Sequence, residues 1–155
     1  MAWDKKEIKG YLVDADNGER LEFQYNPNDI TDDKSTAYAT IKIPGMSHPR
    51  YQYVSGEARR ITFKIKFFKG EVKKQVDWLR SLQYPEHAGS MLKNAPHKVI
   101  LIFGDLYPGV TCIIKQVKAR FFNLFDRDNL LPQQAEVDIV LEEYVDQSVK
   151  WSEVR

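Results

Sequence analysis

The sequence predicts an α+β fold, mainly antiparallel β-sheet or a split barrel, with one principal helix at about residues 71–83. Two observations predict it. Apolar and polar residues alternate in many short segments, which is the pattern of strands with one buried face. A clear helical period occurs only after Gly70, and a lone amphipathic helix needs a sheet to cover. We therefore expect about eight to ten strands with one helix lying across them.

The first two strands are predicted at residues 11–15 and 20–25. The Asn17-Gly18 pair between them is typical of a tight β-hairpin, because both residue types tolerate positive φ angles. A turn at Asn26-Pro27 ends the second strand. The inward side chains of this strand are expected to be Leu21, Phe23 and Tyr25.

Two further strand segments flank a loop rich in glycine and proline. STAYATIKIP and RYQYVSG form a candidate hairpin, from Thr36 to Ser55. The clearest alternation follows in ARRITFKIKFF. Its expected inward residues are Ile61, Phe63, Ile65 and Phe67, and its outward residues are Arg60, Thr62, Lys64 and Lys66.

The second half of the chain contains the helix and the remaining strands. In EVKKQVDWLRSLQYP the apolar residues follow a helical stripe that Pro85 closes. HKVILIF is predicted to be a strand buried on both faces, and GVTCIIKQVKARFFNLF one long bent strand or two shorter ones. The last strand, QQAEVDIVLEEYV, points Ala135, Val137, Ile139 and Leu141 inward, and Glu136, Asp138, Glu142 and Tyr144 outward.

Length and composition indicate an ordinary globular protein. The chain has 155 residues, 43% of them hydrophobic, and a net charge of +1, which argues against a polyanionic partner. We expect a single β-rich domain over 1–155 with short tails at 1–7 and 147–155. The N-terminus is too charged for a signal peptide, and no apolar run is long enough to cross a membrane. A protein used in a cytoplasm, or in something assembled there, is predicted.

Patterns that carry catalysis are missing from the sequence. His48, His87 and His97 have no second ligand at zinc spacing, and no glycine-rich loop has the form that binds phosphate. Cys112 lies in an apolar strand, where a thiolate nucleophile is poorly placed. We therefore predict no enzyme, no metal, no cofactor and no small-molecule substrate.

Three carboxylates follow the Asn26-Pro27 turn, at Asp29, Asp32 and Asp33. A calcium loop is disfavoured because the required glycine and distant glutamate are missing. Two interpretations remain. The segment is either a capped turn with solvated carboxylates or a loop that presents charge to another protein. The second makes these aspartates candidate subunit contacts.

Charged rows on two strands form the next candidate interface. A nucleic-acid platform needs cations and aromatics on one face, whereas alternation separates Phe63 and Phe67 from the cations. The cations instead match the outward carboxylates of the last strand, either side by side in one sheet or across a subunit boundary. These rows are Arg60, Lys64 and Lys66, and Glu136, Asp138 and Glu142.

The tyrosines of the Thr36 to Ser55 hairpin are the third candidate. Tyr38, Tyr51 and Tyr53 lie in an outlying segment, and tyrosine is favoured at protein interfaces. The alternative is that they line the edge of the core.

The ordered segments resemble a known family. FQYNP, YVSGEARRITFKIKFF, a helix ending in LRSLQYP, APHKVILIFGD and the long C-terminal pair, over about residues 20–145, are similar to the N-terminal β-rich domain of contractile injection system tube and baseplate adaptor proteins. In this sequence RDNLL replaces the family's usual turn glycine, so Asn129 is expected to take the left-handed conformation. The LysM domain that many members carry is not found in these residues.

This resemblance implies a structural part of a contractile phage tail or phage-tail-like particle, assembled in the host cytoplasm. The first expectation is a hexameric ring that joins the inner tube and spike hub to the baseplate or sheath. The alternatives are a tail tube or tube-terminator protein of the same particle and, in a different class, a nucleic-acid-binding barrel.

Overall fold

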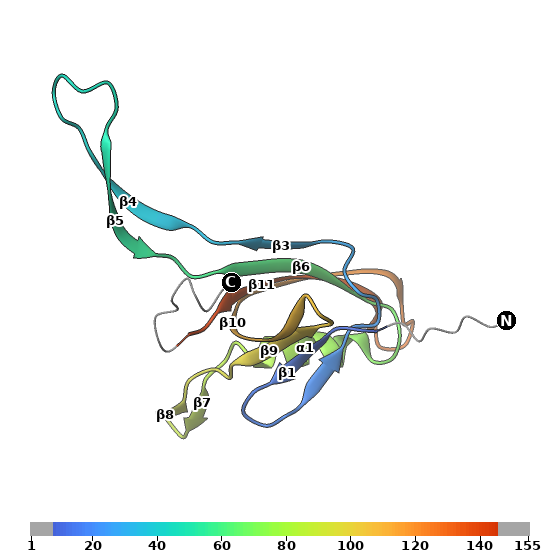
Figure 1. Cartoon of the computed structure of the whole chain (residues 1–155). Helices are drawn as coiled ribbons and strands as arrows, with labels where there is room; N and C mark the ends of the chain where they lie inside the picture. The colour runs from blue at the N-terminus through green and yellow to red at the C-terminus, as the bar shows by residue number, and fades with distance from the viewer. Residues whose placement is uncertain (1–7, 146–155) are drawn as a thin grey trace.

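The computed structural model describes residues 8–145, so the tails predicted at 1–7 and 147–155 lie outside the described residues. The fold is α+β, with antiparallel strands and one helix, as predicted (Figure 1). Residues 8–145 contain eleven strands rather than about eight to ten, because β3, β7 and β8 form where no strand was predicted. The elements are β1 (Tyr11–Asp14), β2 (Arg20–Glu22), β3 (Ile30–Asp33), β4 (Thr36–Ile41), β5 (Arg50–Gly56), β6 (Arg60–Phe67), α1 (Val72–Ser81), β7 (Glu86–Ala88), β8 (Met91–Asn94), β9 (Val99–Phe103), β10 (Tyr107–Phe125) and β11 (Pro132–Glu143).

Seven strands form one sheet in the order β2-β1-β9-β10-β11-β6-β3, and β4–β5 and β7–β8 are separate hairpins. Strand β10 has 19 residues and is the single long strand that was one of the two predicted alternatives. It pairs with β9 as far as Cys112 and with β11 from there to its end, with a register shift between Ile114 and Gln116. The sheet therefore divides at Cys112 into two parts that share β10.

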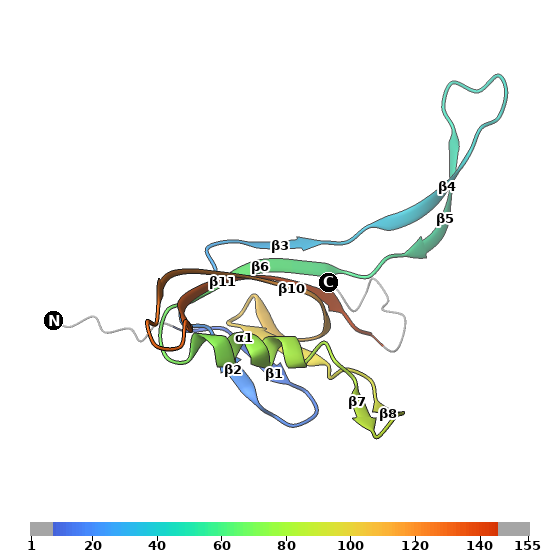
Figure 2. The ribbon, with the colours of Figure 1, turned by 180° about the vertical axis from the view of Figure 1, so that it is seen from behind.

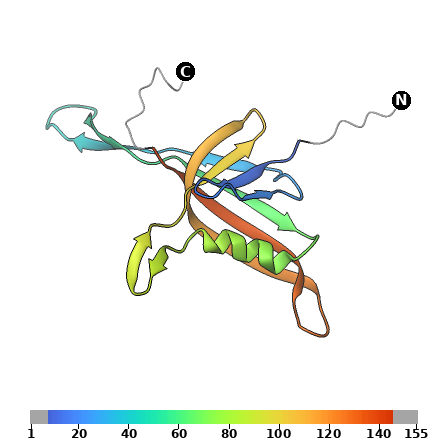
Figure 3. The same ribbon diagram turned by 90° about the horizontal axis from the view of Figure 1, so that it is seen from below.

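The core lies between this sheet and α1, which runs alongside β10 and β11 (Figures 2 and 3). The helix buries Val72, Val76 and Leu79, and its bounds fall within the predicted 71–83. Strand β9 is buried on one face and half-buried on the other, so the prediction of two buried faces is only partly correct. The alternation of β6 and β11 is confirmed by the buried residues Ile61, Phe63, Ile65, Phe67, Ala135, Val137, Ile139 and Leu141.

The chain leaves the sheet in the FQYNP segment, where side chains bond the backbone of other segments. Phe23 is fully buried, but Tyr25 is 58% exposed and stacks on Phe68, so its predicted place in the core is wrong. The physical reason is that β2 ends at Glu22. Beyond that point, the Gln24 side-chain oxygen accepts hydrogen bonds from the backbone N–H groups at 68 and 69. Asn26 similarly bonds the backbone of residues 8 and 10.

The turn between β10 and β11 corrects another prediction. Leu130, not Asn129, has the positive φ, at 55°. The Asn129 side chain instead accepts a hydrogen bond from the backbone N–H of Leu131. An Asn side chain that bonds the backbone two residues ahead stabilises a turn without itself entering the left-handed region.

Candidate subunit interface

The β4–β5 hairpin, called the arm below, projects from the body of the molecule (Figure 1). Its strands pair only with each other among the described residues. All of its side chains are exposed except Ala37, which is half-buried. A two-stranded ribbon with no core of its own is at best marginally stable in water. The arm is therefore a candidate contact surface.

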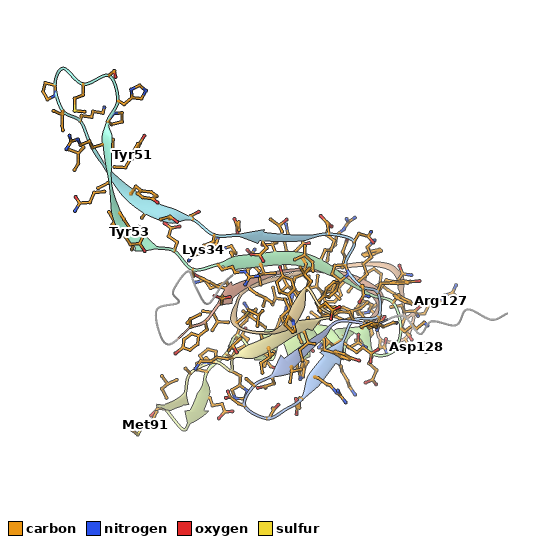
Figure 4. The ribbon with its side chains drawn as sticks, viewed as in Figure 1. Lys34, Tyr51, Tyr53, Met91, Arg127 and Asp128 are labelled. Atoms are coloured by element: carbon orange, nitrogen blue, oxygen red, sulfur yellow. The ribbon has the colours of Figure 1, made fainter. Side chains whose placement is uncertain are left out.

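The three arm tyrosines gather on one face of this ribbon. Tyr38 makes edge-on ring contacts with Tyr51 and Tyr53, at centroid distances of 6.4 and 6.1 Å. Their exposed fractions are 58%, 68% and 63%, so the alternative that they line the core is wrong. Figure 4 shows Tyr51 and Tyr53 on the arm, away from the body. Their role as interface residues remains a prediction.

An ionic clamp fixes the base of the arm to the sheet. The Arg59 guanidinium donates to both carboxylate oxygens of Asp32, with Nη2 to Oδ2 at 2.6 Å, and to Glu143 at 3.1 Å. The Tyr107 hydroxyl also donates to Asp32, at 2.7 Å. Asp32 lies in β3, Arg59 lies just before β6, Glu143 ends β11 and Tyr107 begins β10. The clamp therefore joins distant parts of the chain where the arm leaves the body.

Electrostatics within the clamp follow from these contacts. Hydrogen bonds from Arg59, and then from Tyr107, hold the pKa of Asp32 below its usual range despite partial burial. The Asp32 hydrogen bond raises the pKa of Arg59. Burial, followed by the bond to Asp32, raises the pKa of Tyr107 to about 12. At neutral pH, a carboxylate thus faces a guanidinium and a neutral phenol.

Asp32 and Asp33 lie in a strand, and not in the capped turn or the loop that the two interpretations predicted. Ile30–Asp33 forms β3 and pairs with β6, with Asp33 opposite Arg60. Asp32 points toward the body and binds Arg59, so it is not free to present its charge to a neighbour. Asp29 and Asp33 are exposed. Successive side chains of a strand point to opposite faces, so Asp32 faces the body whereas Asp33 faces away from it.

The charged rows of β6 and β11 lie side by side in one sheet, which confirms the first of the two predicted arrangements. The register places Lys66 opposite Glu136, Lys64 opposite Asp138, and Arg60 opposite Glu142. Lys64 Nζ lies 3.2 Å from Glu136 and 3.8 Å from Asp138. These carboxylates raise the pKa of Lys64, the Glu136 hydrogen bond most of all. Whether the rows also contact another subunit remains a prediction.

Phe63 and Phe67 are buried on the opposite face of the same strand. Cations and aromatics do not share a surface here, which argues against the single-strand platform considered for a nucleic-acid-binding barrel.

A cluster around His97 was not predicted. His97 Nδ1 lies 2.8 Å from Asp14, which is buried, and Nε2 lies 2.8 Å from Glu86, with Asp16 at 3.8 Å. Hydrogen bonds that the ring donates to the carboxylates of Asp14 and Glu86 raise the pKa of His97. Both ring nitrogens bond a carboxylate, which favours a protonated ring that links β1 to β7 over a metal ligand. Asp14 and His97 are far apart in sequence, so spacing could not reveal this cluster.

The geometry offers no activated nucleophile at the cysteine. Cys112 is fully buried, and burial raises its thiol pKa to about 12. A thiol in such a site stays protonated and unreactive at neutral pH. No helix among residues 8–145 is long and apolar enough to cross a membrane.

Comparison with known proteins identifies the family. A family model described as contractile injection system tube protein matches residues 3–151. The chain belongs to this family. It is a structural component of a contractile injection particle and not an enzyme. The predicted alternative, a tail tube protein, is therefore better supported than the baseplate adaptor that was expected first.

Other comparisons are more distant. A similar solved structure is the cryo-EM structure of an extracellular contractile injection system, the PVC sheath-tube complex in the extended state. The likeness has 15% sequence identity and a TM-score of 0.46, and covers 92% of this chain and 90% of that chain. No curated protein matches the sequence.

Proposed function

We propose that copies of this tube-family chain form a hexameric ring, and that such rings stack to build the inner tube of a contractile particle. The family match over residues 3–151 carries this proposal. Two kinds of exposed surface support it, the edges of the sheet and the arm, because each can bind another copy of the chain.

One part of the sheet has two edge strands whose outer edges can pair with a neighbouring copy. Beyond Cys112, β10, β11, β6 and β3 form a four-stranded antiparallel part. No strand within residues 8–145 pairs with the outer edge of β3 or with the outer edge of β10 after Cys112. Unpaired edges offer backbone donors and acceptors to another chain. A contact between two different edges repeats head to tail, and it forms a ring where the rotation from copy to copy closes.

The two faces of this part differ in bulk. The helix, β1, β2 and β9 lie on one side of it, whereas the side with the charged rows is open (Figures 1 and 2). In a closed ring the bulkier side needs the larger circumference and so lies outside. The charged face of β3, β6, β11 and β10 would then line the channel.

The arm supplies the second proposed contact, with another copy of the chain. Tyr51 and Tyr53 are exposed and lie on the arm, away from the body of their own subunit (Figure 4). Large, rigid side chains with a polar tip are effective anchors at protein interfaces.

Copy number in purified particles tests this function against its rivals. A tube is built from many stacked rings, whereas an adaptor or a terminator next to the spike hub, baseplate or sheath needs about one ring per particle. Quantitative mass spectrometry should find this chain in many copies, increasing with particle length. A constant number equal to one ring would contradict the tube and support an adaptor or terminator.

A further inference from the structure

The open face of the four-stranded part carries charges that change sign from each strand to the next. The register places these residues side by side across the sheet. We call the four sets charge columns. They are Asp29 and Asp33 at β3, Arg60, Lys64 and Lys66 on β6, Glu136, Asp138 and Glu142 on β11, and Lys115, Lys118 and Arg120 on β10.

Inside the subunit, neighbouring columns attract one another. Lys64 joins the β6 column to Glu136 and Asp138 on β11. Lys115 joins the β10 column to Glu142 at 3.4 Å. The Asp29 charge acts on Lys64 from the β3 side. Opposite charges at facing strand positions favour a given pairing, and like charges disfavour it.

The two outermost columns are opposite in sign. Asp29 and Asp33 lie at one edge of this part of the sheet, and Lys118 and Arg120 lie at the other. None of these four takes part in an ion pair within residues 8–145, although Arg120 lies over the Phe122 ring. The strands alternate in direction across the sheet, so a neighbour's β3 beside β10 would continue the antiparallel order.

We infer that the β10 edge of one copy pairs with the β3 edge of the next, so that the basic column of β10, with Lys118 and Arg120, lies beside the neighbour's acidic column of Asp29 and Asp33. This inference rests on the proposed ring and names the residues that determine its joint. The alternation of charge would then run around the ring without interruption.

The core-side face of the same two edges supports the joint independently. Val117, Ala119 and Phe121 of β10 are only half-buried, whereas the β11 residues opposite them are fully buried. Ile30 at the β3 edge is also half-buried. A neighbour's edge would cover this apolar surface, so both faces of the joint are complementary.

The columns also exclude the wrong pairings. Two β3 edges would bring carboxylates together, and two β10 edges would bring cations together, both of which are unfavourable. Symmetric dimers through either edge are therefore disfavoured. Among the pairings of these two edges, that of β10 with β3 is the one that joins opposite charges, and as a head-to-tail contact it can close into a ring.

Two charge-reversed variants test the inference. K118E/R120E has two acidic edges, and D29K/D33K has two basic edges. Each variant alone should associate at least about ten-fold more weakly than the wild type at low salt. An equimolar mixture should recover rings in which the variants alternate, because every joint regains opposite charges. Analytical ultracentrifugation measures association, and native mass spectrometry counts each variant in a ring.

Controls separate assembly from folding. K73E/K74E makes the same change in charge as K118E/R120E on the exposed side of α1, where Lys73 and Lys74 form exposed ion pairs with Asp77 and Glu71, and it should assemble like the wild type. Recovery in the mixture also requires both variants to be folded. Wild-type assembly by either reversed variant alone, or a mixture that stays as weak as its components, would overturn the inference. If the wild type forms rings and reversal of the four charges does not weaken them, only the inference fails. If the wild type forms no rings, the proposed function is contradicted.

Discussion

The arm and the β6–β11 pair are both antiparallel β structure, yet they differ in what stabilises them. On β6 every second side chain is buried against the core, whereas the side chains of β4 and β5 are exposed except Ala37. The β6–β11 pair is therefore stabilised within its own subunit. In the arm, exposed tyrosines contact one another and no side chain is fully buried. The centre of the fold is therefore packed within the subunit, whereas the arm at its periphery is left exposed.

Truncation in the core should have the largest effect on stability. Phe63→Ala removes a buried ring that packs against Phe23 at a centroid distance of 5.6 Å. We expect it to lower the free energy of unfolding by about 3–5 kcal/mol, from lost burial and the cavity left behind. Urea denaturation monitored by circular dichroism measures this. A loss as small as that of an arm substitution would remove the contrast between the two regions.

Breaking the clamp should have an intermediate effect, because the clamp lies between the two regions. Arg59→Ala leaves Asp32 and Glu143 without their cation and should cost about 1–3 kcal/mol. Arg59→Lys should recover part of this loss, since lysine keeps the charge but not the bidentate geometry. Urea denaturation again provides the measurement. Asp32→Asn should destabilise the protein more than Asp33→Asn, and equal effects would show that the clamp contributes nothing.

The His97 cluster predicts a smaller, pH-dependent effect. The cluster raises the pKa of His97 in the folded protein, so its contribution is complete below the ordinary value of about 6.5. It is lost as the pH rises through the raised folded value. We expect a decrease on the order of 1 kcal/mol that His97→Gln abolishes. Thermal melts from pH 5 to 9 measure it, and a pH dependence that survives His97→Gln would assign it to other groups.

Substitution in the arm should have the smallest effect on stability. Tyr51→Ala and Tyr53→Ala expose no core, so each should change the free energy of unfolding by less than about 0.5 kcal/mol. Ring or tube formation should nevertheless weaken, as sedimentation of the same samples would show. Normal assembly by both variants would mean that the arm tyrosines are not anchors.

Local patterns predicted much of this fold. The alternation in ITFKIKF and EVDIVLE fixed both buried faces, and the helical stripe fixed α1, because burial imposes a strict period on each element. The edge strand β3 escaped prediction. Its residues, Ile30–Asp33, include only one apolar side chain, and its formation depends on pairing with β6.

The candidate site was less predictable, because its residues meet through tertiary contacts. Arg59 and Glu143 are 84 positions apart, and no local pattern links them. Lys118 and Arg120 alternate with apolar residues in QVKARF, so this signal was present in the sequence. It gained meaning only when the structure placed β10 at an edge opposite β3.

A cryo-EM map of the assembled tube, from the particle or from purified protein, would show the proposed joint itself. We expect hexameric layers in which β10 of each copy pairs with β3 of the next. The charge columns should face the channel, and α1 should lie outside. A ring closed through other elements, or one with α1 facing the channel, would contradict this arrangement.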